Sequence, residues 1–333
     1  MKHKTIPVFV PHMGCPNDCS FCNQKKITGE ESNITPKSAD LQIAAALKTI
    51  PQDADCVEIG FFGGSFTGID IELQREFLSV AKKYKDAGEV DEIRLSTRPD
   101  YIDEKILDML CDYGVTTVEL GAQSMDDRVL LLNHRGHLSS DTERAAKLIK
   151  KSGIKLGLQM MTGLYGDDDE TCIKSAEKII ALKPDCVRIY PTLVLSGTYL
   201  EGLYKNGSYK PQTLDDAVSL CAKLKERFDK KKIPVIRIGL MASDNINPDA
   251  DVVAGPYHPS IGELVMSENY LKNILQEIST DAEILVNKKD ISAFVGNNKK
   301  NIKRLKEAGY EVTFKSSEEI APGSFKIQRK EQR

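Results

Sequence analysis

The sequence predicts an α/β protein, a partial (β/α)6 TIM-like barrel followed by a small C-terminal βααβ domain. Short apolar runs rich in β-branched residues alternate with longer amphipathic stretches, which indicates repeated strand–helix units. Such units place their strands parallel, with right-handed crossovers. In addition, unusual residues follow five successive expected strands. A curved sheet would bring those five strand ends to one mouth, and this favours a barrel over a doubly wound sheet.

Seven apolar runs are expected to be strands, and six longer stretches to be helices. The strands are expected at 6–11, 56–62, 91–97, 115–121, 154–162 and 185–190, with 233–240 as a seventh candidate. The helices are expected at 38–50, 71–87, 102–113, 139–152, 168–182 and 212–231. Ser38, Asp100 and Asp141 are of the residue types that cap helix N-termini, and they lie near three of the expected starts.

The chain is expected to contain two domains. A length of 333 residues suits one large α/β domain with a small appendage, and we assign 1–280 to the barrel with its extension and 283–333 to a small basic domain. This last segment holds twelve Lys and Arg against seven Asp and Glu, while the whole chain carries −3. A basic tail suits a polyanionic partner, although a solvated charged helix explains it equally well.

No apolar run approaches the length of a membrane-spanning helix, and the N-terminus passes directly into an expected strand without a secretory signal. We therefore expect no membrane partner and a reducing, cytoplasmic location.

Three cysteines in one short loop carry the strongest chemical signal. Cys15, Cys19 and Cys22 are spaced C-x3-C-x2-C, with Phe21 directly before the last. Three thiolates supply three of the four ligands of a cubane iron–sulfur cluster, which leaves one iron open to a ligand that is not protein. Zinc bound by the same thiolates and His12 is the alternative, and the spacing alone leaves both metals open. The five remaining cysteines fall within expected strands or helices and are predicted to be buried apolar side chains: 56, 111, 172, 186 and 221.

Several motifs resemble one family in the right order: VPHMGCPNDCSFCNQ, FFGGSFTG, RLSTRPDYID, VELGAQS and RIYPTLVLSGTYLEGLYKNGSY. They are similar to the radical S-adenosylmethionine (SAM) part of the Elongator catalytic subunit family and, more distantly, to oxygen-independent coproporphyrinogen oxidase. The resemblance covers about residues 5 to 270. It implies a [4Fe–4S] cluster held by the three cysteines, SAM chelated to the open iron, and reductive cleavage of SAM to a 5′-deoxyadenosyl radical. The electron donor implied is a ferredoxin or flavodoxin.

The resemblance also implies which residues contact SAM. These are Phe21 and Gly163 near the adenine, Gly63 and Gly64 at the methionine amine, Ser96 and Gln123 at the ribose, Arg135 at the carboxylate, and Gln159 at the nucleoside. Ser96 departs from the family, in which a glutamate is common at this position, and a serine reaches less far.

The substrate that the resemblance implies is an RNA, a tRNA base. The acetyltransferase domain and the N-terminal tRNA-binding extension of the Elongator subunit have no counterpart in these 333 residues. Two alternatives therefore stay open: a small-molecule substrate, as in coproporphyrinogen oxidase, and an RNA-binding protein with a vestigial SAM site. Tyr257 and His258, after the seventh expected strand, are candidate acid–base or radical-relay groups, with a rigid proline-bounded linker as the alternative.

The basic C-terminal segment contains VGNNKKNIKRLKEAGYEVTF, which is similar to the core of a KH domain. A KH domain clamps a nucleic-acid backbone with a GXXG loop between two helices. The corresponding RNA-binding residues here would be Gly296, Asn297, Asn298, Lys299 and Lys300. Lys299 stands in place of the second glycine, so a structural βααβ cap remains the alternative.

Overall fold

The structure is a computed structural model that describes residues 2–10, 19–23, 34–240 and 246–329. The chain divides into two compact units. The first comprises Met1–Gln212 and Phe228–Tyr257, and the second comprises Thr213–Arg227 and His258–Arg333. The expected start of a separate domain at residue 283 lies inside the second unit.

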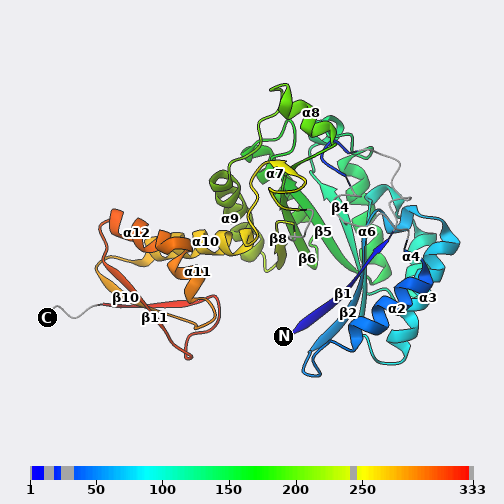
Figure 1. The fold of residues 1–333 in the computed structure, drawn as a ribbon, viewed down its shortest axis with the longest axis horizontal. Coiled ribbons are helices and arrows are strands. Elements are labelled where there is room, and N and C mark those ends of the chain that lie inside the picture. The colour runs from blue at the N-terminus through cyan, green and yellow to red at the C-terminus, as the bar shows by residue number, and fades with distance from the viewer. Residues whose placement is uncertain (1, 11–18, 24–33, 241–245, 330–333) are drawn as a thin grey trace. The chain divides into compact units, whose positions relative to one another are not determined.

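The first unit is built on one parallel seven-stranded sheet, as predicted (Figure 1). The strand order is β1-β2-β3-β4-β5-β6-β8, so each strand pairs with its neighbours along the chain. The strands are β1 His3–Val10, β2 Cys56–Gly63, β3 Glu92–Thr97, β4 Thr117–Gln123, β5 Lys155–Thr162, β6 Cys186–Pro191 and β8 Val235–Ile238. The helices that connect them along the chain are α2 Pro36–Leu47, α3 Ile71–Asp86, α4 Glu104–Asp112, α5 Asp127–Leu132, α6 Ser139–Ser152, α7 Asp169–Ala181, α8 Tyr199–Lys205 and α9 Leu214–Lys230. Of α9, residues 214–227 belong to the second unit.

At two of the helix starts that differ from expectation, the capping side chain explains the difference. Helix α2 begins at Pro36, since the Thr35 hydroxyl accepts the backbone N–H of Ser38 and forms a capping box with it. Helix α4 begins two residues later than expected, because Asp103 caps it. Asp100 instead binds the guanidinium of Arg98.

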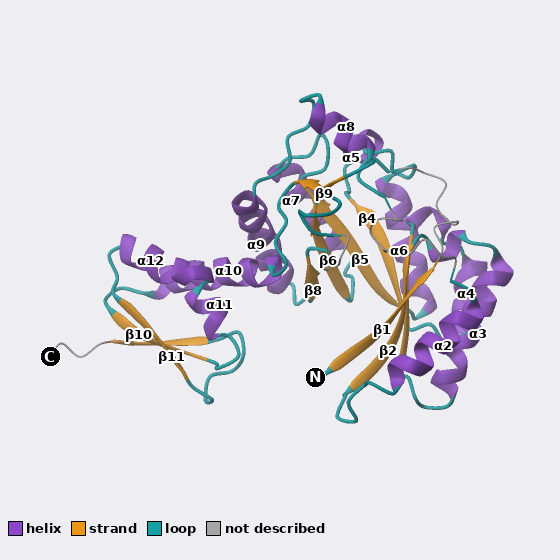
Figure 2. Cartoon of the chain, viewed as in Figure 1, coloured by secondary structure: helices purple, strands orange, loops and turns teal. Residues whose placement is uncertain are grey.

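The two faces of the sheet differ in chemistry. The face under the helices (Figure 2) is apolar, and its side chains are at most 1% exposed: Ile59, Phe61, Ile93, Leu95, Val118, Leu120, Leu156 and Leu158. Because side chains alternate along a strand, the residues between these point to the other face. That face carries the buried charges Glu58, Arg94 and Glu119. It is the lumen face of the half-barrel.

The second unit contains a three-stranded sheet covered by helices. The sheet has the order β11-β10-β12, and β10 pairs parallel with β11 and antiparallel with β12. Its elements are α10 Ile261–Glu277, β10 Ala282–Val286, α11 Ile291–Val295, the 3-10 turn η4 Asn297–Lys299, α12 Lys300–Glu307, β11 Val312–Ser316 and β12 Phe325–Arg329. The rings of Phe294 and Tyr270 stack in its core, with centroids 3.8 Å apart. The sequence predicted the βααβ order but missed β12.

A short two-stranded sheet, β7 Val194–Leu195 with β9 Val252–Ala254, completes the first unit and was also not expected. Among the described helices, none is both long enough and apolar enough to cross a membrane.

Candidate functional site

The end of the cysteine loop is held in place by a buried serine. Ser20 donates from Oγ to Asn133 Oδ1 at 2.7 Å and from its backbone N–H to the Asn133 carbonyl at 3.1 Å. Its own carbonyl accepts the N–H of Leu200, the second residue of α8. Cys19 and Cys22 flank this anchor, and the N–H of Cys22 donates to the Cys19 carbonyl. Cys15 and His12 lie outside the described residues, so the structure does not position the first cysteine.

Arg135 connects the cysteine loop to the end of β4. Its Nη1 lies 3.1 Å from Cys19 Sγ, and its Nη2 donates to the Gly121 carbonyl at 2.6 Å. An added Cβ on Gly121 would lie 3.1 Å from Gln123 Nε2, so the glycine leaves room for the Gln123 amide. The side chain is buried, and its Nε has no hydrogen-bond partner among the described residues. The structure therefore joins two residues that the sequence assigned separately, a metal ligand and a SAM contact.

Gln123 and Gln159 come together at the next strand ends. Gln159 Nε2 donates to Gln123 Oε1 at 3.2 Å. Gln123 has a positive φ of 64°, and the β4–β5 register shifts beside it. Such a conformation costs energy in a residue with a side chain and is concentrated at functional sites. Gln123 and Gln159 lie on the neighbouring strands β4 and β5, and Arg135 reaches β4 through the Gly121 carbonyl. Their roles as SAM contacts stay a prediction.

The Gly63–Gly64 turn is fixed by hydroxyl groups that the sequence did not single out. Thr97 Oγ1, at the end of β3, lies 2.7 Å from Ser65 Oγ and 2.6 Å from Thr67 Oγ1. All three side chains are buried. Gly63 itself has φ 102°, which favours glycine. The turn is thus held against β3 while its glycines remain without side chains.

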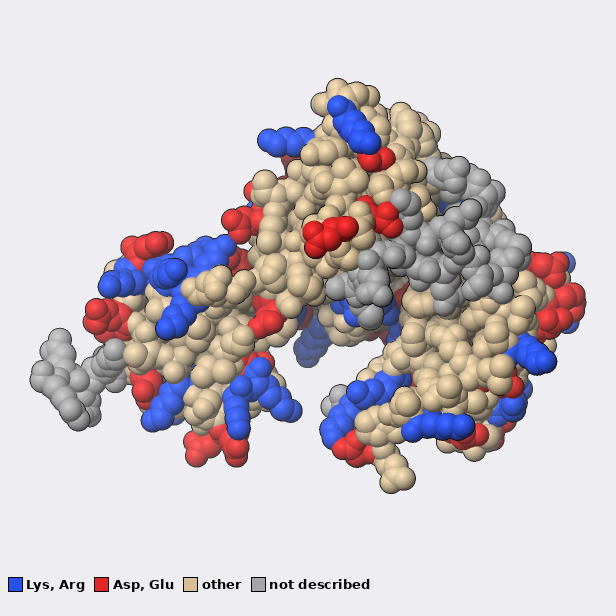
Figure 3. All heavy atoms as spheres, viewed as in Figure 1, with Lys and Arg blue, Asp and Glu red and all other residues tan. Residues whose placement is uncertain are grey.

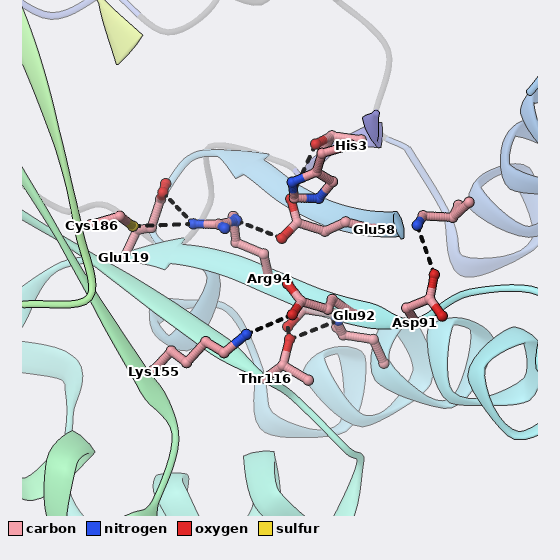
Figure 4. Close-up of polar contacts among 12 residues, drawn as sticks. His3, Glu58, Asp91, Glu92, Arg94, Thr116, Glu119, Lys155 and Cys186 are labelled. Carbon is pink, nitrogen blue, oxygen red and sulfur yellow. Dashed lines mark hydrogen bonds and ion pairs between the residues drawn. The ribbon is translucent and has the colours of Figure 1, made fainter. Parts of the chain in front are cut away.

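Ser96 faces a buried ion-pair network on the lumen side of the sheet. Its Oγ lies 3.4 Å from Glu119 Oε2, and Glu119 Oε1 accepts from Arg94 at 2.6 Å and from Arg188 at 3.0 Å. Arg94 also donates to Glu58 at 2.8 Å (Figure 4). Burial disfavours the charge of Arg94, but Glu119 and Glu58 outweigh this and raise its pKa above the usual range.

Phe21 and Gly163 lie near the same tyrosine. Phe21 packs against the apolar cluster that contains Tyr209 and Leu200. The Tyr209 hydroxyl donates to the Gly163 carbonyl at 2.6 Å. An added Cβ on Gly163 would lie 2.6 Å from Gln212 Oε1, so this amide occupies the space beside the glycine.

Tyr257 and His258 are placed at the start of the segment that leads into α10. Tyr257 packs against a small apolar cluster that includes Leu193 and Val252. His258 Nδ1 accepts the backbone N–H of Ser260 at 3.1 Å, just before α10 begins. Their role as acid–base or radical-relay groups stays a prediction.

The predicted RNA loop is an exposed turn between α11 and α12. Three of its residues have positive φ: Gly296 at 78°, Asn298 at 50° and Lys299 at 58°. The buried side chain of Asn301 fixes the turn from below, because its Nδ2 donates to the Phe294 carbonyl at 3.0 Å and to Ser267 Oγ at 2.9 Å. The backbone shape of the turn is therefore set by contacts within the second unit.

His137 provides a pH-dependent stability that can be measured. Burial first, and Arg135 second, lower its pKa to about 4 from 6.5, and its Nε2 has no partner among the described residues. The folded state holds the neutral ring, so its contribution is complete above pH 6.5 and is lost as the pH falls toward 4. Between pH 7.5 and 5 we expect the unfolding free energy to fall by about 2 kcal/mol more in the unsubstituted protein than in His137→Gln.

Urea unfolding at several pH values measures this difference. Asp167 has the opposite dependence, because burial raises its pKa to about 6, and the comparison with His137→Gln cancels that contribution. Equal pH slopes for the two proteins would contradict a buried neutral His137.

Comparison with known proteins agrees with this geometry. Residues 9–179, about half of the chain, match the radical SAM superfamily, and residues 184–273 match the Radical_SAM C-terminal domain. A tRNA uridine(34) acetyltransferase of Methanocaldococcus jannaschii is 31% identical over 239 residues, 66% of this chain and 43% of that protein. Elongator complex protein 3 of Homo sapiens is 31% identical over 198 residues, 54% of this chain and 36% of that protein. The chain thus spans less than half the length of these relatives.

Another relative is of similar extent. An uncharacterized protein of Methanocaldococcus jannaschii is 28% identical over 277 residues, 82% of this chain and 80% of that protein.

Among solved structures, the archaeal Methanocaldococcus infernus Elp3 with an N-terminal deletion superposes with a TM-score of 0.64 at 26% identity. The match covers 83% of this chain and 63% of that one. Coproporphyrinogen III oxidase of Escherichia coli shares the fold, with a TM-score of 0.51 at 14% identity. The predicted resemblance to the Elongator catalytic subunit family is confirmed. With its parallel half-barrel and its strand-end residues, the chain belongs to the radical SAM superfamily.

Proposed function

We propose that this protein binds a [4Fe–4S] cluster through Cys15, Cys19 and Cys22 and cleaves SAM reductively, for the modification of a tRNA base. The observation that supports the cluster site best is the buried guanidinium of Arg135 at 3.1 Å from Cys19 Sγ. Hydrogen bonds to the ligating sulfurs help to set the properties of an iron–sulfur cluster, and Arg135 is placed to donate one to Cys19 Sγ. The superfamily match makes iron–sulfur the better reading than zinc for this loop.

The polar groups at the strand ends beside the cysteine loop suit SAM. The methionine part of SAM carries a carboxylate, and Arg135 Nε is a buried donor without a partner among the described residues. Leaving such a donor unpaired costs free energy, and a carboxylate would satisfy it. The turn of Gly63 and Gly64 offers backbone groups with no Cβ in the way. The amide pair of Gln123 and Gln159 offers acceptors and donors to a ribose.

Each group would then have a defined task. When bound, the reduced cluster supplies the electron that breaks a carbon–sulfur bond of SAM and yields the 5′-deoxyadenosyl radical. Arg135 holds the carboxylate end, the glycine turn leaves room for the amine, and the amides orient the nucleoside. Ser20 and Asn133 keep the cysteine loop fixed against α5 and α8. The electron would come from a ferredoxin or flavodoxin.

The tRNA substrate is proposed from two features. Two relatives, whose matches each cover 66% of this chain, are named tRNA uridine(34) acetyltransferases. The second unit presents Lys299, Lys300, Lys303 and Lys306 along the predicted RNA loop and α12, where Lys and Arg side chains gather on the surface (Figure 3). Clustered lysines beside a shaped turn suit the phosphates of a nucleic acid.

Anaerobic reconstitution tests the chemistry. The reduced protein, incubated with SAM, is expected to release 5′-deoxyadenosine, and Cys22→Ala is expected to abolish both cluster loading and product. Cys111→Ala is the matched control, because Cys111 is exposed on α4 and lies outside the cysteine loop. Equal product from Cys22→Ala would refute the proposed cluster site.

A separate measurement tests the tRNA partner. We expect the double variant Lys299→Gln with Lys303→Gln to bind tRNA at least about 10-fold more weakly at moderate salt. Its affinity should also depend less on salt, because binding with fewer phosphate contacts releases fewer counterions. The control is Lys105→Gln with Lys147→Gln, two exposed helix lysines of the first unit. If both double variants bind tRNA as the parent does, the loop is a structural cap. If the unsubstituted protein cleaves SAM but binds no tRNA, the tRNA proposal is wrong and a small-molecule substrate is the explanation that remains.

A further inference from the structure

Three side chains with metal-binding atoms meet at the amino ends of the first three strands. His3, Cys56 and Glu92 are the first residues of β1, β2 and β3. One ligand atom from each lies within 4.8 Å of the other two. This group lies at the opposite end of the strands from the cysteine loop, which follows β1. It is therefore separate from the site described above.

The sheet itself brings the three together. His3 is the register partner of Cys56, and Glu58 is the partner of Glu92. Cys56 and Glu58 are two residues apart, so they share the lumen face. Glu92 lies on this face because it alternates with the apolar Ile93, and Cys56 is half-buried rather than buried as the sequence predicted. Donors held on paired strands are positioned more rigidly than donors on loops.

The donor set matches zinc. Cysteine sulfur, histidine nitrogen and carboxylate oxygen are its usual ligands, and three protein ligands leave a fourth position for water. In a tetrahedral site with bonds of about 2.0 to 2.3 Å, ligand atoms lie about 3.5 Å apart. The three ligand atoms therefore need to approach one another by about 1 Å to hold one metal ion.

The neighbouring groups support the same assignment (Figure 4). Lys155 Nζ lies 2.6 Å from Glu92 Oε1, which leaves the other carboxylate oxygen for a metal. Glu58 Oε1 lies 3.7 Å from His3 Nε2, beyond hydrogen-bond distance but beside the ring. Metal-bound histidines and carboxylates commonly have such supporting partners. The Lys155–Glu92 ion pair and the proximity of Glu58 to His3 explain these contacts without a metal, but neither uses the Cys56 thiol.

We propose that His3, Cys56 and Glu92 bind a zinc ion that fastens β1 to β2 and β3. Strand β1 is an edge strand of the sheet, and among the described strands it pairs with β2 alone. Its carboxyl end leads into the segment that carries the three cysteines. A metal at its amino end would hold the strand that supports the cysteine loop. This inference does not depend on the proposed SAM chemistry.

Cobalt(II) titration of the full chain tests the site. Cys15, Cys19 and Cys22 are first replaced by alanine, so that the cysteine loop cannot bind the probe. We expect one equivalent of Co²⁺ to bind, with sulfur-to-cobalt charge-transfer absorption and the visible bands of tetrahedral coordination, and Zn²⁺ to displace it. Adding Cys56→Ser is expected to remove the charge-transfer band and weaken binding by more than about 100-fold, the upper end of the loss for a group that only supports a ligand. Adding Cys111→Ser instead is the matched control and should change neither.

If the protein with the three alanine substitutions does not fold, a second measurement tests the site. The protein with all its cysteines, carrying a reconstituted cluster, is analysed for zinc after removal of loosely bound metal. About one zinc per chain is expected, and His3→Gln, Cys56→Ser or Glu92→Gln should each lower it. Absence of stoichiometric metal in both preparations, or binding that survives Cys56→Ser, would overturn the proposal.

Discussion

Replacing Arg135 with methionine is expected to weaken SAM binding to the cluster-loaded protein by about 10- to 100-fold, because a buried charge-assisted hydrogen bond contributes about 1.5–3 kcal/mol. The same guanidinium donates to Cys19 Sγ and to the Gly121 carbonyl, so its removal also takes a hydrogen bond from a sulfur that we propose as a cluster ligand. We therefore expect a second effect, a change in the reduction potential of the cluster. Equilibrium binding of SAM and a redox titration followed by electron paramagnetic resonance measure the two effects separately.

Two variants sharpen this prediction. Arg128→Met removes an arginine of α5 whose Nη2 donates to the Gly166 carbonyl, and it should leave SAM affinity and potential unchanged. Arg135→Lys keeps the positive charge, but one ammonium group cannot contact Cys19 Sγ and the Gly121 carbonyl and also donate to the SAM carboxylate. This variant should therefore recover only part of the SAM affinity. Full recovery by lysine would mean that charge alone matters. No loss in Arg135→Met would contradict the assigned role.

The barrel was predictable from local signals. Each expected strand overlaps an observed strand of the sheet, because short β-branched runs between amphipathic helices leave few topologies open. The prediction of a site at the strand ends rests on the same topology. Taken singly, Gly63 also fits an ordinary tight turn and Arg135 a surface arginine, so neither residue alone identifies a site. Their roles came from a resemblance, while their meeting at one end of the sheet follows from parallel strands.

The contacts within the site were not predictable. Arg135 and Cys19 are 116 residues apart, and their contact depends on how the α5–α6 loop folds back over β4. Glu119 lies between apolar neighbours in the sequence, where a lone charge usually marks an exposed position. Only the register of β3, β4 and β6 shows that two arginines compensate it. Likewise β12 escaped prediction, because it is short and its partner strand β10 is about 40 residues earlier, although Phe325 and Ile327 alternate with polar residues and pack on the core.

The buried network at Glu119 leads to the largest expected loss of stability. Its carboxylate is 4% exposed and pairs with Arg94 and Arg188 at 2.6 and 3.0 Å. Glu119→Gln keeps the shape but leaves two buried guanidinium groups with one remaining carboxylate, Glu58. Breaking a buried pair in this way costs about 3–5 kcal/mol. We expect a corresponding drop in the unfolding free energy by urea denaturation, with an unchanged denaturant slope.

A surface pair and a double variant separate this explanation from a general sensitivity of the fold. Lys151→Gln removes the partner of Glu104, and since these side chains are 76% and 70% exposed, it should cost less than about 1 kcal/mol. Arg188→Met should cost less when Glu119→Gln is already present, because the repulsion between the unpaired arginines is then relieved. Strictly additive losses would show that the two residues do not interact. A loss below about 1 kcal/mol for Glu119→Gln would mean that water or a ligand already screens the charges of the two arginines. The ion-paired side chains of the lumen face would then not be closed off from solvent, contrary to what their burial indicates.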